Sequence, residues 1–181
     1  MLDRYDNMAT IDDLIKIEML EAIPLDQVEP FLSAKPFYKL DGGLNTRDLS
    51  DGNYPNLKLG YAYRSGSLEN LTTKGQDELV QLGVRTIFDL RSMAEFTTYP
   101  DPQIDGIDVI PAQIDSNYDS QAAETGMIDL GEMYLYMLAA SKPGFRAILS
   151  HILEFPERPF LFHCAGRGVQ SSFEAGIRPM Y

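Results

Sequence analysis

The apolar positions of this chain change their spacing along the sequence, and each spacing predicts a different element. In residues 1–24 they recur every three or four residues, with Thr10 placed to cap a helix and Pro24 placed to end it. This period predicts one amphipathic helix whose polar face is mostly carboxylate. We interpret it as a solvated arm packed on the domain, in preference to a partner-binding helix. Its apolar positions are Ile11, Leu14, Ile15, Met19 and Ala22.

The next segment, residues 25–44, has no regular apolar period. It contains Pro30 and Pro36 and ends in Gly42 and Gly43. Because proline and glycine are the strongest local breakers of regular structure, we expect an irregular approach to the domain that includes a turn.

Two apolar runs in the following part predict strands. Residues 58–68 alternate in part and then break into a polar turn. Residues 84–92 form a β-branched and aromatic run that delivers Asp89 and Arg91 to its carboxyl end. In an open α/β sheet, that end of the strands is where ligands bind.

Between these runs the spacing predicts a helix over residues 73–82. Thr72 and Thr73 can cap its start, and Gln76, three residues after Thr73, can complete a capping box. Gly83 is placed to end the helix.

Residues 97–125 are rich in proline and polar side chains. We expect one short strand in this stretch, residues 107–110, and otherwise loop. A loop of this length in a compact domain forms a lid or a wall of the substrate site, or else is a surface excursion.

Two apolar stripes then predict helices, with Pro143 near the start of the second and Pro156 after its end. His151 is expected at the edge of the second helix, with no chemical role. A short apolar strand, residues 160–162, follows. The first stripe contains Leu130, Met133, Tyr134, Met137 and Leu138, and the second contains Phe145, Ile148, Leu149, Ile152 and Leu153.

This order of strands and helices predicts an α/β fold with a mostly parallel central sheet flanked by helices. We divide the chain into the helical arm of residues 1–24, an α/β domain over residues 25–170, and an atypical tail over residues 171–181 that lacks an apolar stripe. The 181 residues, 44% of them hydrophobic, are enough for one domain with its own core.

Charge and targeting signals narrow the classes of function. The net charge is -12 and the isoelectric point is near 4.5, so long-range repulsion opposes nucleic acids and anionic membranes as partners. No apolar run is long enough for a membrane span, and no secretory signal is visible. We therefore expect a cytoplasmic protein in a reducing setting.

The candidate chemistry lies at the end of the last strand, where His163 and Cys164 run into a glycine-rich loop. Cys164 is the only cysteine, so it forms no internal disulfide. A buried structural cysteine is the alternative. A thiol at the start of such a loop can lie where several backbone N–H groups converge, which suits a tetrahedral anion and stabilises a thiolate. Phosphoryl transfer to the thiolate also requires an arginine for the phosphate oxygens and an acid for the leaving oxygen.

Four ordered motifs between residues 37 and 165 resemble those of the cysteine-dependent protein tyrosine phosphatases, specifically the bacterial and fungal tyrosine/serine phosphatase family. Asn45 to Leu49 match the family's Asn-Phe-Arg-Asp-Leu motif, with Thr46 in place of Phe, and Arg64 to Leu68 match its Arg-Ser-Gly/Ser-Leu turn. Asp89 to Ser92 match an Asp-Leu-Arg-Ser strand end, and Phe160 to Ala165 match the strand that leads into His-Cys. Any one motif is weak, whereas four in order are a strong signal.

The resemblance implies a protein tyrosine phosphatase fold and the hydrolysis of phosphomonoesters through a cysteinyl-phosphate intermediate, without metal or cofactor. A phosphorylated protein or a phosphoinositide is the implied substrate. Cys164 is the candidate nucleophile and Asp89 a candidate acid; Asp89 can equally be structural, accepting hydrogen bonds from the backbone or an arginine. Candidate phosphate-binding residues are Ala165, Gly166, Arg167, Gly168, Arg64 and Arg91, and candidate supporting residues are His163, Asn45, Arg47, Asp48 and Ser171. Some of these arginines and Asp48 can instead serve in structural ion pairs.

The loop itself departs from the family's His-Cys-x-x-Gly-Lys-Asp-Arg-Thr-Gly pattern. Without a gap, Gln170 stands at the arginine and Val169 at the acidic residue, and a one-residue deletion restores neither. Loss of the guanidinium is expected to cost about 2 to 5 kcal/mol of transition-state binding. We also hypothesise that the sequence after Ala165 is truncated or frame-shifted, and that the family's C-terminal helices are missing.

Two other functions compete with the phosphatase interpretation. The first is a pseudophosphatase that binds phosphate without turnover. The second is a rhodanese-like sulfurtransferase, whose short cysteine-initiated loop is similar to Cys164 to Gly168. The sulfurtransferase alternative leaves the motifs at residues 45–49 and 64–68 unexplained.

Overall fold

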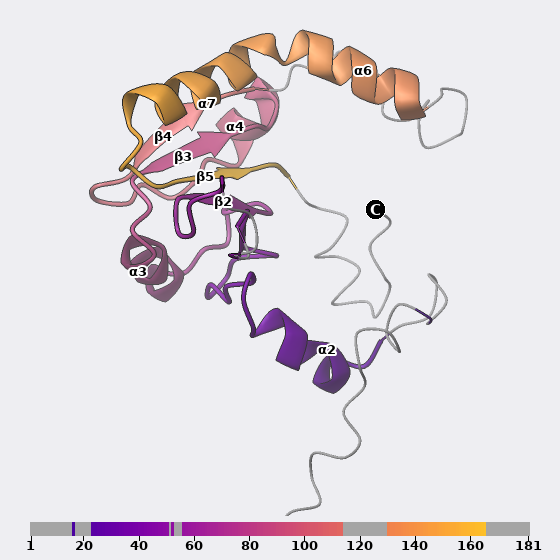
Figure 1. Cartoon of the computed structure of the whole chain (residues 1–181), viewed down its shortest axis with the longest axis vertical. Coiled ribbons are helices and arrows are strands. Elements are labelled where there is room, and N and C mark those ends of the chain that lie inside the picture. Colours follow the sequence, from indigo (N-terminus) through magenta and orange to yellow (C-terminus); the bar gives the residue numbers. More distant parts are fainter. Residues whose placement is uncertain (1–15, 17–22, 51, 53–55, 114–129, 166–181) are drawn as a thin grey trace, which may run out of the picture.

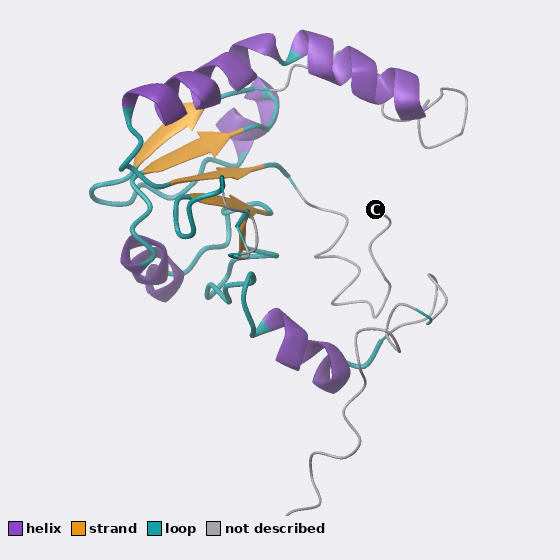
Figure 2. Cartoon of the chain, in the orientation of Figure 1, coloured by secondary structure: helices purple, strands orange, loops and turns teal. Residues whose placement is uncertain are grey.

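The computed structural model describes residues 16, 23–50, 52, 56–113 and 130–165. In this part of the chain the strands form one five-stranded sheet in the order β1-β2-β5-β3-β4 (Figures 1 and 2). β1 is antiparallel to β2, and the other neighbours are parallel, so the predicted α/β fold with a mostly parallel sheet is confirmed. The strands are β1 (Arg47–Asp48), β2 (Ala62–Ser65), β3 (Thr86–Asp89), β4 (Asp108–Pro111) and β5 (Phe160–His163).

Helices cover both faces of this sheet. In Figure 1, α7 lies across one side of the sheet near β3 and β4, and α3 lies on the opposite side. α6 continues in line beyond α7. The described helices are α2 (Leu25–Leu32), α3 (Thr73–Gln81), α4 (Met93–Thr98), α6 (Leu130–Ala140) and α7 (Lys142–Glu154).

Alternate side chains of the strands contribute to two separate hydrophobic cores, one on each face of the sheet. Leu161 of β5 belongs to the cluster that includes Leu79 of α3, whereas its neighbour Phe160 belongs to the cluster against which Ala147 and Ile148 of α7 pack. Successive side chains of a strand point to opposite faces, so β5 holds both helical layers onto the sheet. Phe160 and Leu161 are 2% and 0% exposed, so both cores close tightly around this strand.

The last described strand in sequence occupies the middle of the sheet. β5 pairs with β2 on one side and with β3 on the other, and Leu161 lies opposite Tyr63 and Ile87. The residue that follows β5, Cys164, is therefore at the centre of the carboxyl edge of the sheet.

Residues 25–32 were expected to be irregular, and that prediction is wrong. They form α2, which contains Pro30 and starts after Pro24. Pro30 removes one backbone donor from this helix, and the other residues of the helix keep theirs. The turn expected at Gly42 and Gly43 is present, with Gly42 at a positive φ of 79°.

The helix predicted over residues 73–82 is confirmed as α3, but its cap differs from the prediction. Thr72 alone caps it, accepting a hydrogen bond from the N–H of Gly75 at 3.1 Å. Gln76 takes no part in a capping box and donates instead to the carbonyl of Leu71 at 3.3 Å. Gly83 follows the helix with a φ of 82°, as expected of a residue that ends one.

A capping box does occur at the next helix along the chain, which the sequence pattern did not predict. Ser92 accepts from the N–H of Glu95, whose carboxylate accepts from the N–H of Ser92 in return, and α4 follows. The six-residue length of α4 and its lack of buried residues explain why no apolar period identified it.

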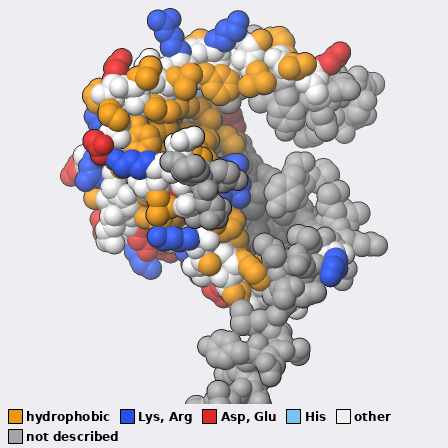
Figure 3. Space-filling model, viewed as in Figure 1, with side chains coloured by type: hydrophobic (Ala, Val, Ile, Leu, Met, Phe, Trp, Pro, Cys, Tyr) orange, Lys and Arg blue, Asp and Glu red, His pale blue; other side chains and the backbone are white. Residues whose placement is uncertain are grey.

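The face that α7 buries also differs from the prediction. Leu149 and Leu153 of the predicted apolar stripe are 59% and 82% exposed, whereas His151 is only 6% exposed. The His151 ring packs edge-on against Phe88 and Phe160, and its Nε2 lies 3.0 Å from the carbonyl oxygen of Arg158. His151 is therefore a core residue and not one at the helix edge. Figure 3 shows the apolar side chains that this orientation leaves at the surface over α7 and α6.

Some predictions fall on parts of the chain that are not described. The arm of residues 1–24 is described only at Lys16, Ile23 and Pro24, and the predicted loop of residues 97–125 only as far as Gln113. Among the described helices, none combines the length and the apolar character that crossing a membrane requires.

Candidate active site

The parallel strands place the chemistry-bearing motifs at one edge of the sheet. β2, β5 and β3 end in register at Ser65, His163 and Asp89, which are direct neighbours across the sheet. The motifs that the sequence separates by up to a hundred residues therefore meet at this edge. Ligands of open α/β sheets bind outside the carboxyl ends of the strands, so this edge is the candidate active site.

Cys164 follows the central strand at this edge and is exposed. Its exposure contradicts the alternative of a buried structural cysteine. A thiol that is free and accessible can act as a nucleophile.

The residues after Cys164 are described only through Ala165, which is half-buried. The predicted phosphate-binding residues Gly166, Arg167 and Gly168, the supporting Ser171 and the convergence of N–H groups around the thiol all lie outside the described residues. These assignments stay predictions.

His163 immediately precedes Cys164 in the chain and is buried. Its Nε2 is 2.7 Å from Oδ2 of Asp101, and its Nδ1 is 3.4 Å from the carbonyl oxygen of Cys164. His163 thus connects the end of β5 to a buried carboxylate that the sequence pattern did not single out. Asp101 stands between Pro100 and Pro102 in a segment without periodicity, so only its flanking prolines were visible from the sequence.

Asp89 is bound on both oxygens by Arg91. The backbone N–H and Nε of Arg91 each donate to Oδ1 at 2.9 Å, and Nη2 donates to Oδ2 at 2.6 Å. Asp89 is 0% exposed. This geometry is that of the structural alternative, in which Asp89 accepts hydrogen bonds from an arginine, and it offers no exposed acid to a substrate.

Arg91 faces inward as well. Its side chain is 1% exposed and also donates to Asp101 at 2.9 Å. Burial alone would lower the pKa of Arg91, but the hydrogen bonds to Asp89 and the charges of Asp101, Asp89 and Glu69 outweigh it and raise the pKa above its ordinary value. The guanidinium is committed to carboxylates, so the structural pairing that the sequence left open describes Arg91 better than phosphate binding does.

Asp89, Asp101 and His163 have the side-chain types of a metal site, and their candidate ligand atoms lie within 4.8 Å of one another. Both carboxylates, however, already accept hydrogen bonds from the Arg91 guanidinium. Asp89, Asp101, His163 and Arg91 therefore form a buried polar network in which the positive charge beside the two carboxylates is the Arg91 guanidinium.

Arg64 differs from Arg91 because it is exposed. It belongs to β2, lies opposite Phe162 of β5, and precedes Ser65 at the candidate edge. Arg47 of β1 pairs with Arg64 across the sheet, and its guanidinium lies 5.6 Å from the centre of the Phe37 ring. Arg64 is thus exposed to solvent, whereas Arg47 packs on an aromatic ring, and the phosphate-binding role expected of Arg64 stays a prediction.

The motif around Asn45 is tied to the turn after β2. Thr46 Oγ1 lies 2.9 Å from Ser65 Oγ, and the carbonyl of Leu44 accepts from Ser65 Oγ and from the N–H of Gly66. Asn45 sits in this connection with a left-handed φ of 51°, which Asn tolerates better than most residues. The two sequence motifs form one rigid corner beside the end of β5.

Asp48 lies away from this corner, toward the start of β2. Its Oδ1 accepts from the N–H of Ser50 at 2.9 Å and its Oδ2 accepts from the N–H of Gly60 at 2.6 Å. Asp48 therefore closes the connection between β1 and β2, and its contribution to the site is indirect.

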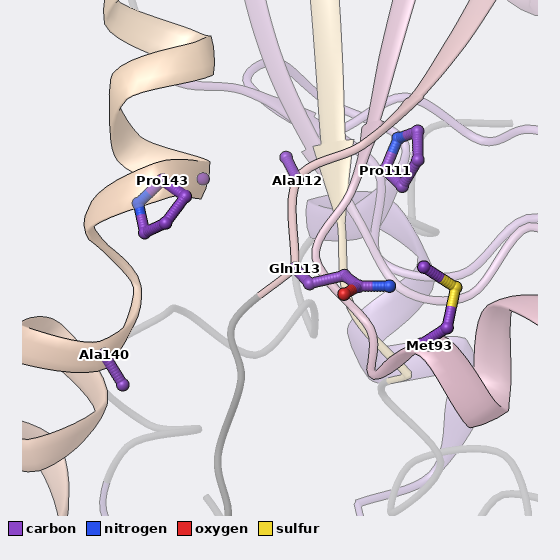
Figure 4. A pocket seen from close by; sticks show the side chains of 7 residues that line it. Met93, Pro111, Ala112, Gln113, Ala140 and Pro143 are labelled. Atoms are coloured by element: carbon purple, nitrogen blue, oxygen red, sulfur yellow. The ribbon is translucent and has the colours of Figure 1, made fainter.

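A hollow of about 380 Å³ opens beyond the end of β4 (Figure 4). In Figure 4, Met93 and Gln113 lie on one side of this hollow, and Ala140 and Pro143 lie on the other. The buried Nε2 of Gln113 has no hydrogen-bond partner among the described residues. The sequence pattern gave no signal for this hollow, because its lining comes from α4, β4, α6 and α7, which are separate in sequence.

Comparison with known proteins agrees with the motifs that meet at this edge. One relative, a tyrosine-protein phosphatase of Nostoc commune, is 31% identical over 119 residues, which are 63% of this chain and 40% of the relative. The matched part thus spans less than half the length of that protein. Residues 38–167 match the model of the tyrosine phosphatase family. Since that match includes all four motifs and most of the chain, the chain belongs to the tyrosine phosphatase family.

Proposed function

We propose that this chain is a phosphatase that hydrolyses phosphomonoesters through a covalent intermediate on Cys164. The observation that carries the proposal is the position of the only cysteine, free and exposed immediately after the central strand. Family membership supports phosphoryl chemistry at that position.

The proposed reaction has two steps. The Cys164 thiolate attacks phosphorus, a sulfur–phosphorus bond forms, and the phosphorus–oxygen bond to the leaving group breaks as that oxygen takes up a proton. Water then attacks phosphorus, the sulfur–phosphorus bond breaks, and inorganic phosphate leaves. The thiolate is regenerated, so the reaction needs neither oxidant nor cofactor.

The described residues supply part of this machinery. Cys164 is the nucleophile, and exposed Arg64 is positioned to attract the phosphate despite the acidic composition of the chain. Asp89 and Arg91 hold the strand end below the thiol and do not contact the substrate. We assign the substrate to phosphorylated proteins or phosphoinositides, in a reducing cytoplasm that keeps the thiol free.

Turnover of p-nitrophenyl phosphate tests the proposal, with wild-type protein compared against Cys164→Ser. We expect the serine variant to lose turnover, because a serine hydroxyl is a much weaker nucleophile than a cysteine thiolate. Ser150→Ala on α7 is the matched control, and its rate should equal that of the wild type. Acid quenching followed by mass spectrometry should find phosphate on the peptide that contains Cys164. Equal rates for wild type and Cys164→Ser would remove the claim.

A second candidate function, phosphate binding without hydrolysis, is favoured by the residues at the end of the loop. Gln170 and Val169 stand where the family pattern has its arginine and its acid. Saturable binding of phosphotyrosine by calorimetry, with no turnover by the wild type, would establish this alternative. Gln170→Arg should then raise phosphate affinity, since a guanidinium binds the phosphate oxygens in a bidentate manner.

A further inference from the structure

The helix α7 has an apolar face that points away from the sheet. Its inner face holds Gly144, Ile148 and His151 against the sheet. Its outer face carries four large apolar side chains that are all exposed, namely Phe145, Leu149, Ile152 and Leu153. Positions spaced in this way share one face of a helix, so these four side chains form a continuous outer stripe. Because the stripe is exposed, no element in the described part of the chain covers it.

The exposed apolar surface continues from α7 onto α6 (Figures 1 and 3). α6 adds Leu135, Tyr136 and Leu138, and these side chains and those of the outer stripe are between 37% and 82% exposed. At about 150 to 250 Å² for a large apolar side chain, they leave roughly 600 to 900 Å² of apolar area in solvent. Monomers rarely expose more than a few hundred Å² in one patch, whereas each partner in a stable interface buries about 800 Å². The exposed area therefore matches one half of a stable dimer interface.

Charged residues of opposite sign lie at the two ends of the outer stripe. Lys142 and Arg146 lie in the first part of α7, and Glu154 is its last residue; all three are exposed. Arg146 and Glu154 lie on opposite sides of Leu149 along the helix. When two copies of α7 cross antiparallel near Leu149, Arg146 of each copy comes opposite Glu154 of the other, whereas a parallel pair places like charges together. The charges of the stripe are thus complementary to those of a second copy in the antiparallel direction.

The net charge of the chain also favours this face for contact between copies. At a net charge of -12, two copies repel each other over most of their surfaces. α7 is an exception, because its 13 residues contain two basic side chains and a single carboxylate. Repulsion between two copies is therefore weakest where the apolar stripe lies. An interface about a two-fold axis uses the same patch of both copies, so it needs a patch that is complementary to itself.

We propose that the outer stripe of α7, extended by the exposed apolar residues of α6, is the interface of a homodimer. In this dimer α7 of one copy packs antiparallel on α7 of the second copy, and the two-fold axis passes near Leu149. The proposal does not depend on the proposed function, because none of the interface residues belongs to the candidate active site.

Sedimentation equilibrium of the full chain over a range of protein concentrations measures the association, since one copy has a mass of 20.3 kDa. We expect the wild type to approach twice this mass as the concentration rises. Leu149→Glu should raise the dissociation constant of the dimer at least about thirtyfold, because a charge from each copy would then lie in an apolar contact. Far-ultraviolet circular dichroism establishes that the variant is folded.

Leu32→Glu is the matched control. Leu32 is an exposed leucine of α2, which Figure 1 places at the far end of the molecule from α7. It undergoes the same chemical change and should leave the dissociation constant as in the wild type. A wild type that stays at 20.3 kDa at every concentration would overturn the proposal, even if it binds vesicles of phosphatidylserine, and so would a dimer that Leu149→Glu leaves intact.

A charge exchange tests the antiparallel arrangement. Arg146→Glu should weaken the dimer about threefold to tenfold, because it places two carboxylates opposite each other at each end of the paired helices. Glu154→Arg should weaken it to a similar extent by placing two guanidinium groups together. The double variant has the opposite pair at the same places, so its dissociation constant should return to that of the wild type. Failure of the double variant to recover would contradict the antiparallel pairing.

Cross-linking locates the two-fold axis with a smaller change to the surface. In Cys164→Ser protein, which has no other cysteine, Leu149→Cys introduces a thiol close to its own copy across the axis. Mild oxidation should convert this protein to a disulfide-linked dimer on a non-reducing gel. Leu32→Cys in the same background should stay a monomer on that gel. Equal cross-linking of the two proteins would show that the contact is not specific to α7 and would overturn the proposal.

Discussion

Nη2 of Arg91 lies 2.6 Å from Oδ2 of Asp89, and the two side chains are 1% and 0% exposed. Only one residue separates them, so the pair closes the turn at the end of β3. The backbone N–H of Arg91 joins the same carboxylate at 2.9 Å, which ties the turn to the side-chain pair. This pair therefore fixes the end of β3 beside His163, the residue that precedes Cys164.

Removal of Arg91 should therefore destabilise the fold strongly. Arg91→Met is expected to lower the free energy of unfolding by about 3 to 5 kcal/mol, because it leaves Asp89 and Asp101 as buried, uncompensated charges. Urea unfolding followed by far-ultraviolet circular dichroism measures the loss. Lys74→Met breaks the exposed pair of Lys74 with Glu78 and should cost no more than about 0.5 kcal/mol. A similar small loss in Arg91→Met would show that the buried pair contributes little.

The sequence was sufficient to place Asp89 and Arg91 at the end of a strand, because a β-branched run ends there and strand ends follow from the apolar pattern. It could not decide between a catalytic and a structural role. That choice depends on where the Arg91 side chain turns, and this is set by Asp101, ten residues away in a segment with no period. The spacing of hydrophobic residues in a sequence carries no information about which polar side chains meet in the folded protein.

The orientation of α7 shows that apolar spacing also fails to predict which face of a helix is buried. A stripe of leucine, isoleucine and phenylalanine predicted the buried face, yet Leu153 is 82% exposed and His151 is buried. The existence of the helix follows from its period. Its rotation about its own axis depends on Gly144, which allows close approach to the backbone of Ala112, and one glycine within a helical pattern does not reveal such a contact.

Alkaline pH should weaken the fold through Tyr63. Burial foremost, and then the charges of Tyr38 and Asp48, raise the pKa of Tyr63 to about 12 from its ordinary value of 10.0. Protonated Tyr63 therefore contributes its full share to the free energy of unfolding below about pH 10. This share, about 2 to 3 kcal/mol in total, is lost as the pH rises toward 12. Urea unfolding at a series of pH values measures this slope.

Tyr63→Phe should flatten that alkaline slope. At neutral pH it should cost at most about 1 kcal/mol, because the hydrogen bond that the hydroxyl donates to the carbonyl of Leu82 is a long one of 3.3 Å. Tyr136→Phe, at a residue 46% exposed, is the control and should keep the slope of the wild type. An equally steep slope in Tyr63→Phe would assign the alkaline loss to other groups.

The exposure of Cys164 predicts a simple thiol titration. Native protein should react with Ellman's reagent to release one equivalent of thionitrobenzoate, because the thiol needs no unfolding to reach solvent. Protein denatured in guanidinium should give the same stoichiometry, and Cys164→Ser should give none. A thiol that reacts only after denaturation would place Cys164 in the interior and remove the basis of the proposed nucleophile.

The close contact between α7 and Ala112, the residue after β4, predicts that Gly144 tolerates no larger residue. A Cβ at this position would meet the carbonyl oxygen of Ala112, which belongs to the backbone and cannot move aside as a flexible side chain would. Alanine has the higher helix propensity by about 1 kcal/mol, so a surface site would gain stability from Gly→Ala. Gly144→Ala should instead lose about 1 to 3 kcal/mol, since α7 must lift from the sheet and loosen the packing of Ile148 and His151. Ser150→Ala on the same helix should change stability by no more than about 0.5 kcal/mol. Thermal and urea unfolding of the two variants compare them directly, and a stabilised Gly144→Ala protein would show that α7 does not press on Ala112 as the structure has it.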